Sequence, residues 1–242
     1  MPYPVAAVRG KNYGGASYAN KVLSYSPIAY WPLNEATGAV ATDYSGNGYN
    51  GAYVTVTLGQ TGIGDGNTCP LFDGTNDYVN IYSAGLAGAF SGVTGTLMIW
   101  EKMFNVGVWT DGNTRYAVRL AVDTNNQITI NRTTTNNQNS CLYEANNTQE
   151  KRTKEGLSDT GWVHYAITWS KTAEEVRVYY GGVQEGVTMT TLGVWAGALH
   201  SLSVIIGDGT TTLDNHWYGW LAHCAVWDSV LTPAQIADLA AV

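Results

Sequence analysis

Apolar and polar residues alternate with a period of two through most of the chain between Ala29 and Trp227. Successive side chains of a β-strand point to opposite faces, so this period is typical of strands with one buried face. In WVHYAITW every second residue from Val163 to Trp169 is large and apolar, and EVRVYYGG repeats the pattern before a Gly-Gly turn. The alternation predicts strands at 29–33, 49–54, 68–73, 77–82, 95–103, 115–122, 127–133, 141–144, 162–169, 175–181, 201–207 and 218–227.

Two short segments have helix signals instead. SYANKVLSYSP begins with Ser17, a good N-cap, and ends before a proline. Near the C-terminus, LTPAQIADLAAV offers Thr232 as the N-cap, Pro233 at the first helical position and Gln235 to complete a capping box. The sequence therefore predicts one short helix on each side of the strand-rich region.

The remaining segments differ in composition. Pro2 and Pro4 disfavour regular strand pairing, so residues 1–16 are interpreted as an N-terminal arm. The polar span 123–160 is interpreted as a hairpin with a long exposed loop. No repeat or internal linker interrupts the rest, which predicts a single domain over residues 17–242.

Composition and charge narrow the function classes. The 242 residues carry a formal net charge of −7, which argues against a nucleic-acid partner because phosphate binding needs clustered Lys and Arg. No apolar run approaches the length of about 20 residues that spans a bilayer, and the N-terminus lacks the pattern of a secretory signal. The three cysteines, Cys69, Cys141 and Cys224, are far apart and are expected to be buried thiols.

Eight motifs occur in an order that resembles a known family. They are PIAYWPLNEATG, DYSGNGYNGAY, FDGTNDYVNI, GTLMIWEKM, GWVHYAITW, VRVYYGG, VIIGDG and YGWLAHCAVWDSVLTPAQIADL. Their succession from Pro27 to Leu239 resembles the laminin-G-like, concanavalin A-like jelly-roll modules. The resemblance implies an all-β fold: a two-sheet antiparallel jelly-roll sandwich of six or seven strands per sheet, with a short C-terminal helix and the extended arm in front.

The resemblance also implies a role in binding glycans, proteins or a virion surface, although some relatives hydrolyse β-glucans. Hydrolysis by a retaining mechanism needs two carboxylates about 5.5 Å apart. The sequence has no E-x-D-x-E-like run, and Glu101, which could face the concave sheet, stands alone in its strand. We therefore expect a protein without catalytic residues.

The segment DYSGNGYNG has two interpretations. In the resembling modules it is the turn that leads from the first strand into the next, and Asp43 can cap such a turn through its carboxylate. Alternatively, Asp43 and Asn47 offer oxygen ligands for calcium, which needs six to eight of them. Asp73 or Asp77 would then have to converge on the same site.

Three tryptophans lie in stretches typical of loops, where exposed rings could stack on sugars. The predicted ligand-binding rim is formed by Trp109, Asp111, Asn113 and Tyr116 together with Asp214, Asn215 and Trp217. The alternative is that these rings bury against a neighbouring subunit, where aromatic residues are also enriched.

Two function classes follow. The first is a surface protein of a bacteriophage particle, a capsid decoration or tail-fibre protein, made in the host cytoplasm without a signal peptide. In that case residues 1–16 would bind the virion or sister subunits, and the protein would be a homo-oligomer. The second is a glycan-binding, lectin-like module of an extracellular, cell-surface or carbohydrate-active protein.

Overall fold

The computed structural model describes residues 17–209 and 215–242; the predicted arm, residues 1–16, lies outside the described residues. The helices are α1 (Tyr18–Ser24), α2 (Ala84–Ala89) and α3 (Pro233–Leu239), with a short 3₁₀ helix η1 (Val106–Thr110). The strands are β1 (Ala29–Trp31), β2 (Val40–Ala41), β3 (Gly51–Val54), β4 (Thr57–Thr61), β5 (Thr68–Asp73), β6 (Tyr78–Asn80), β7 (Thr94–Met103), β8 (Arg115–Ala121), β9 (Asn126–Arg132), β10 (Asn139–Ala145), β11 (Thr148–Lys154), β12 (Val163–Ser170), β13 (Glu175–Tyr180), β14 (Val183–Gln184), β15 (Val204–Ile206) and β16 (Tyr218–Trp227).

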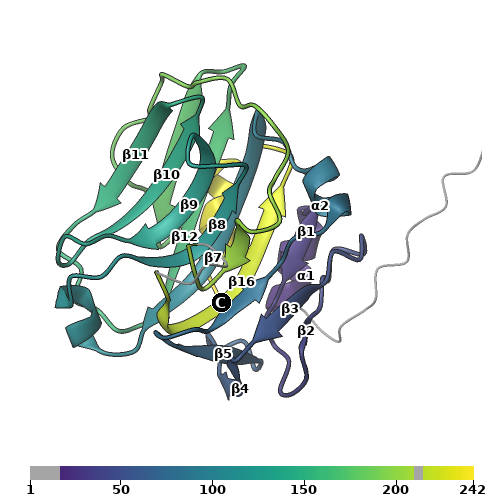
Figure 1. Ribbon diagram of the computed structural model, residues 1–242, viewed down its shortest axis with the longest axis vertical. Helices are drawn as coiled ribbons and strands as arrows, with labels where there is room; N and C mark the ends of the chain where they lie inside the picture. Colours follow the sequence, from purple (N-terminus) through teal and green to yellow (C-terminus); the bar gives the residue numbers. More distant parts are fainter. Residues whose placement is uncertain (1–16, 210–214) are drawn as a thin grey trace, which may run out of the picture.

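These strands form two antiparallel sheets that pack face to face (Figure 1). Sheet I has the order β14-β13-β12-β7-β16-β5-β4, and β1 also pairs with β16. Sheet II has the order β11-β10-β9-β8-β15-β6-β3-β2. The predicted two-sheet sandwich is confirmed, with eight strands in each sheet where six or seven were expected.

The alternating pattern places the core as predicted. In β12, the side chains of Val163, Tyr165, Ile167 and Trp169 all belong to the cluster between the sheets. Ala166, from the same strand, belongs to a second cluster on the outer face of sheet I. Every second side chain along such a strand is buried between the sheets, and this burial of apolar surface supplies most of the free energy that stabilises a sandwich.

The outer face of sheet I is partly covered by α1 and α3. The Tyr18 hydroxyl donates to the Leu239 carbonyl at 2.5 Å and accepts a hydrogen bond from the Trp100 indole at 2.7 Å, so it ties both helices to the sheet. Both predicted N-caps are confirmed: Ser17 accepts from the Asn20 N–H, and Thr232 takes part in a complete capping box.

The segment DYSGNGYNG is a turn organised by one buried carboxylate. Asp43 accepts hydrogen bonds from the N–H groups of Tyr30, Ser45 and Tyr49 at 2.9–3.0 Å and from the Ser45 hydroxyl at 2.8 Å. Asn47 is exposed and donates to the Ile28 carbonyl. Four donors on one carboxylate explain why an aspartate stands at this position.

Three further features extend or correct the sequence prediction. The polar span 123–160 is not a hairpin with a long loop, because residues 148–154 form the edge strand β11. Glu101 does not face an open surface: its side chain lies between the sheets and accepts a hydrogen bond from Asn139 of sheet II. The three cysteines are buried and unpaired, as expected. No helix in the described part of the chain is long and apolar enough to cross a membrane.

Candidate functional site

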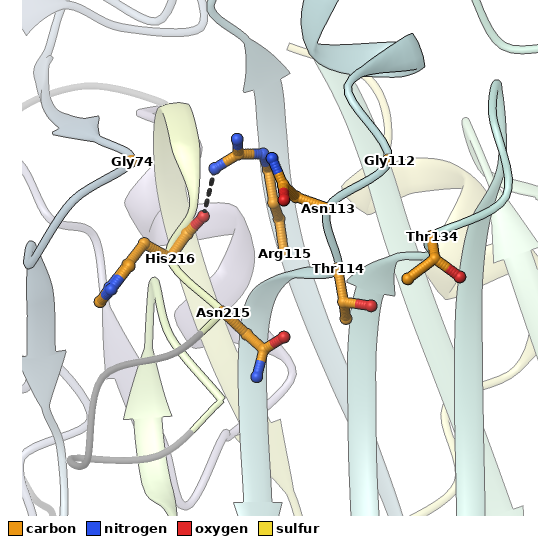
Figure 2. A pocket seen from close by; sticks show the side chains of 8 residues that line it. All are labelled: Gly74, Gly112, Asn113, Thr114, Arg115, Thr134, Asn215 and His216. Atoms are coloured by element: carbon orange, nitrogen blue, oxygen red, sulfur yellow. Dashed lines mark hydrogen bonds between the residues drawn. The ribbon is translucent and has the colours of Figure 1, made fainter.

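One end of the sandwich carries a polar depression of about 350 Å³ where loops from both sheets meet. Sheet II contributes the segment that leads into β8, the first residue of β8 and Thr134 in the turn after β9, while sheet I contributes the turn after β5 and the segment before β16. The depression is lined by Gly74, Gly112, Asn113, Thr114, Arg115, Thr134, Asn215 and His216 (Figure 2).

Arg115 joins the two sheets beneath this depression. Its guanidinium group donates to the His216 carbonyl at 2.7 Å and makes two hydrogen bonds to the Asp111 carboxylate, at 2.6 and 3.1 Å. Figure 2 shows this side chain between the segment that bears Asn113 and the segment that bears His216. Because the planar guanidinium group of Arg115 is hydrogen-bonded to both segments, it holds them in one relative position.

A second arginine, Arg132, stabilises the same loop from inside the sandwich. Its fully buried guanidinium group donates to the carbonyls of Trp109 and Asn113 and lies 3.1 Å from the other carboxylate oxygen of Asp111. Partial burial disfavours the charged form of Asp111. The N–H of Asn113 and the two arginines outweigh it, however, and lower the pKa of this carboxyl below its ordinary value.

The opposite wall is fixed by a buried acid. Asp208 is fully buried, and its carboxylate lies 2.8 Å from the His216 imidazole and accepts a hydrogen bond from the Asn215 N–H at 3.3 Å. Two carboxylates of the described residues beside the depression are therefore engaged by the protein: Asp111 by two arginines and Asp208 by His216.

What faces solvent in the depression is a set of neutral polar groups. Within the described residues, no hydrogen bond uses the side chains of Asn113, Thr114 or Thr134. Asn113 and Thr134 are exposed and Thr114 is half-buried. Amide and hydroxyl groups on a rigid frame suit a ligand rich in hydroxyl groups, because they can both donate and accept hydrogen bonds.

The structure brings together part of the rim predicted from the sequence. Asn113 and Asn215 line the depression, Asp111 supports it, and Tyr116 lies beside it with its N–H donating to the Asn215 carbonyl at 3.0 Å. Asp214 lies outside the described residues. Sequence reasoning missed Gly74, Gly112, Thr114, Arg115, Thr134 and His216, although four of these six are direct neighbours of predicted positions.

The expectation that two of the rim tryptophans are exposed is wrong. Trp109 is only 4% exposed and its indole donates to the Asp159 carbonyl at 2.7 Å, while Trp217 is fully buried in the core between the sheets. Neither ring can stack on a sugar in this conformation. Both hold the loops on which the polar groups of the depression stand.

The structure offers little support for a metal site. Asp73 and Asp77, the partners needed by Asp43, close their own turn: the Asp77 carboxylate accepts the Asp73 N–H at 2.8 Å. Over residues 17–209 and 215–242, no three His, Cys, Asp or Glu side chains are grouped so that they could hold a metal ion. Calcium binding by Asp43 and Asn47 stays a prediction.

Comparison with known proteins identifies the family of this fold. Residues 73–237 match the family described as the concanavalin A-like lectin/glucanases superfamily. Among curated proteins, none matches the chain.

Solved structures share the fold at low sequence identity. Domain 4 of an extracellular arabinanase from Geobacillus stearothermophilus, in complex with arabinotriose, is 18% identical with a TM-score of 0.65; the match covers 89% of this chain and 98% of that one. The ligand-binding domain of botulinum neurotoxin serotype D in complex with N-acetylneuraminic acid is 13% identical with a TM-score of 0.64, over 92% of this chain. The binding domain of Paraclostridial Mosquitocidal Protein 1 is 13% identical with a TM-score of 0.66, over 90% of this chain. This chain spans 52% of the length of each of these two toxin domains.

Proposed function

Because the chain belongs to the concanavalin A-like lectin/glucanases superfamily, we propose that it is a non-catalytic binding protein that holds a glycan in the polar depression at the end of the sandwich. The observation that carries the proposal is that charged and neutral side chains have different roles at this site. Among the described residues, the charged groups of Asp111, Arg115, Arg132 and Asp208 are engaged in the frame, and neutral amide and hydroxyl groups face outward. Two of the structural relatives were solved with bound sugars, arabinotriose in one and N-acetylneuraminic acid in the other, which supports a sugar as the ligand class.

Glycan arrays followed by titration calorimetry test this proposal. Asn113→Ala and Thr114→Val each remove hydrogen-bonding groups that the fold does not use, so the protein should stay folded. A single hydrogen bond to a ligand is worth about 0.5–1.5 kcal/mol, which corresponds to a loss of affinity of about threefold to tenfold for each variant.

The matched controls are Thr124→Val and Asn125→Ala. Both residues are exposed in the hairpin between β8 and β9, at the opposite end of these strands from the depression. They should bind as the unchanged protein does. Equal binding by all four variants would exclude the depression as the site, and release of free sugar from the ligand would exclude the non-catalytic assignment.

A surface protein of a bacteriophage particle is the more specific role that we propose for this binding protein. What supports it is the anchoring of α1, from which residues 1–16 depart. The Lys21 ammonium donates to the carbonyls of Asp238 and Ala241, and the Tyr18 hydroxyl donates to Leu239, so the starting point of the arm is fixed on the sandwich.

This role is tested with purified particles. The full chain should cosediment with them and form an oligomer, whereas a chain without residues 2–16 should do neither and still bind its glycan. An arm-less chain that attaches and assembles normally would refute the role of the arm but leave glycan binding intact.

A further inference from the structure

A stack of three aromatic rings lies at the end of sheet I where β7 ends and β16 begins. Phe104 is stacked on Tyr218 with ring centroids 4.5 Å apart and an angle of 12° between the planes. Phe104 also stacks with Trp220, with ring centroids 5.6 Å apart and an angle of 16° between the planes. We refer to Phe104, Tyr218 and Trp220 as the aromatic strip.

Cations cover both ends of this strip. The Lys102 ammonium lies 4.8 Å from the centroid of the Trp220 ring, and the Arg115 guanidinium lies 5.6 Å from the centroid of the Tyr218 ring. The one acid paired with the strip across the sheet is Asp73, which stands opposite Tyr218 and accepts the Thr75 N–H at 2.8 Å. The Lys102 end is thus positively charged on a chain whose formal net charge is −7.

The described residues cover the strip only in part. Tyr218 packs against the cluster between the sheets, Trp220 packs against the outer cluster that includes α1 and α3, and both residues are half-buried. Phe104 is 40% exposed, and contact of a large apolar ring with water does not stabilise the fold. In the described residues, no hydrogen bond uses the Lys102 ammonium, the Trp220 indole N–H or the Tyr218 hydroxyl.

The strip is continuous with the polar depression. Arg115 belongs to both, because it lines the depression and lies over the Tyr218 ring. Gly74 also lines the depression, and a β-carbon added there would meet the Tyr218 ring at 3.1 Å. One surface therefore runs from the amide and hydroxyl groups at the end of the sandwich to the rings and the ammonium group on sheet I.

We propose that this continuous surface binds an acidic oligosaccharide, with a carboxylate-bearing sugar on the aromatic strip beside Lys102 and a neutral part of the same chain in the depression. The chemistry of the strip selects the charge of the ligand. It offers an ammonium group, an indole N–H and ring edges, which carry the positive part of the aromatic quadrupole. A sugar is favoured over an acidic peptide because β7 and β16 are interior strands of sheet I and leave no free backbone edge for a peptide to pair with. This inference rests on the proposed glycan-binding function.

The test compares one ligand in two charge states. Short oligogalacturonides carry carboxylates, and their methyl esters have the same sugar backbone with these groups esterified and therefore uncharged. The full chain should bind the acid form more tightly than the ester, with a preference that shrinks as salt is added, since a partly exposed charge contact is screened. Lys102→Met keeps the length of the side chain and removes the charge. It should reduce binding of the acid form by about fivefold, the loss expected of one partly exposed charge contact, and leave binding of the ester unchanged.

A matched control is Lys151→Met, an exposed lysine on β11 of the other sheet. It should not change the preference for the acid form. Equal affinity for acid and ester, an undiminished preference in Lys102→Met, or equally tight and Lys102-dependent binding of an oligoglutamate peptide would each overturn the proposal. If the ester binds and responds to Asn113→Ala while the acid form has no advantage, the depression is a glycan site and only the strip is wrongly assigned. If neither form nor any neutral glycan binds, the proposed function itself fails.

Discussion

Replacing Glu101 by glutamine should remove a loss of stability that the protein undergoes as the pH rises from about 5 to 8. Glu101 is 3% exposed, on the inner face of β7. One carboxyl oxygen accepts a hydrogen bond from Asn139, and the other has no partner among the described residues. Burial of the charged form raises the pKa of Glu101 well above its ordinary value, which is only partly offset by the hydrogen bond from Asn139.

The size of the effect follows from proton linkage. In the unfolded chain this carboxyl ionises near its ordinary pKa of 4.5, whereas the folded protein keeps it protonated to a higher pH. Between these two pKa values the folded state binds more protons, so the free energy of unfolding falls as the pH rises, by about 1.4 kcal/mol per pH unit. Glutamine has almost the same shape, keeps an acceptor for Asn139 and does not ionise.

Urea unfolding followed by tryptophan fluorescence at several pH values measures this directly. Glu101→Gln should match the unchanged protein near pH 5 and exceed it in free energy of unfolding by a margin that grows toward pH 8. Glu155→Gln, at an exposed position, is the control and should follow the unchanged protein throughout. Parallel pH profiles for Glu101→Gln and the unchanged protein would refute the assignment of a buried, protonated carboxyl.

Three other predictions concern folding. Trp109→Ala and Trp217→Ala should each lower the free energy of unfolding by about 3–5 kcal/mol, because both rings are buried; chemical denaturation checks this, and a folded variant of normal stability would contradict it. Asp43→Ala leaves four donors of the turn without their acceptor and should cost about 2–4 kcal/mol. In the unchanged protein, a melting temperature that is the same in calcium and in a chelator is expected if Asp43 serves only the turn, and a rise of several degrees with calcium would establish the metal site instead. Burial lowers the pKa of His164 to about 3, so the unfolded chain binds a proton that the folded protein does not, and the free energy of unfolding falls as the pH drops below the ordinary value of 6.5. His164→Leu should reduce this fall in the free energy of unfolding at acid pH. An unchanged acid limb in His164→Leu would show that this histidine does not take up the proton.

The sequence predicted the strands well where one face of a strand is buried, because burial imposes the alternation. It failed at β11, whose sequence TQEKRTK has no apolar face to reveal it. This strand lies at the edge of sheet II, and charged residues at an edge discourage pairing with other molecules. Glu101 could have been placed correctly, since it has the same strand parity as the core residues Leu97 and Ile99.

The candidate site was predictable in its position and not in its details. Gly, Asp, Thr and Asn around Trp109 and Trp217 correctly indicated loops at one end of the sandwich. Whether a ring in such a loop is exposed depends on distant partners, here the carbonyl of Asp159 for Trp109. Arg132 lies in a strand far from the loop in sequence and yet holds it from within, which no local pattern reveals.

Backbone amide chemical shifts during titration with the best glycan from an array test the central assignment most directly. Binding in the polar depression predicts the largest changes at Asn113, Thr114 and Thr134 on one side and at Asn215 and His216 on the other. Saturable changes confined to other parts of the surface, with these five amides unmoved, would contradict the assignment.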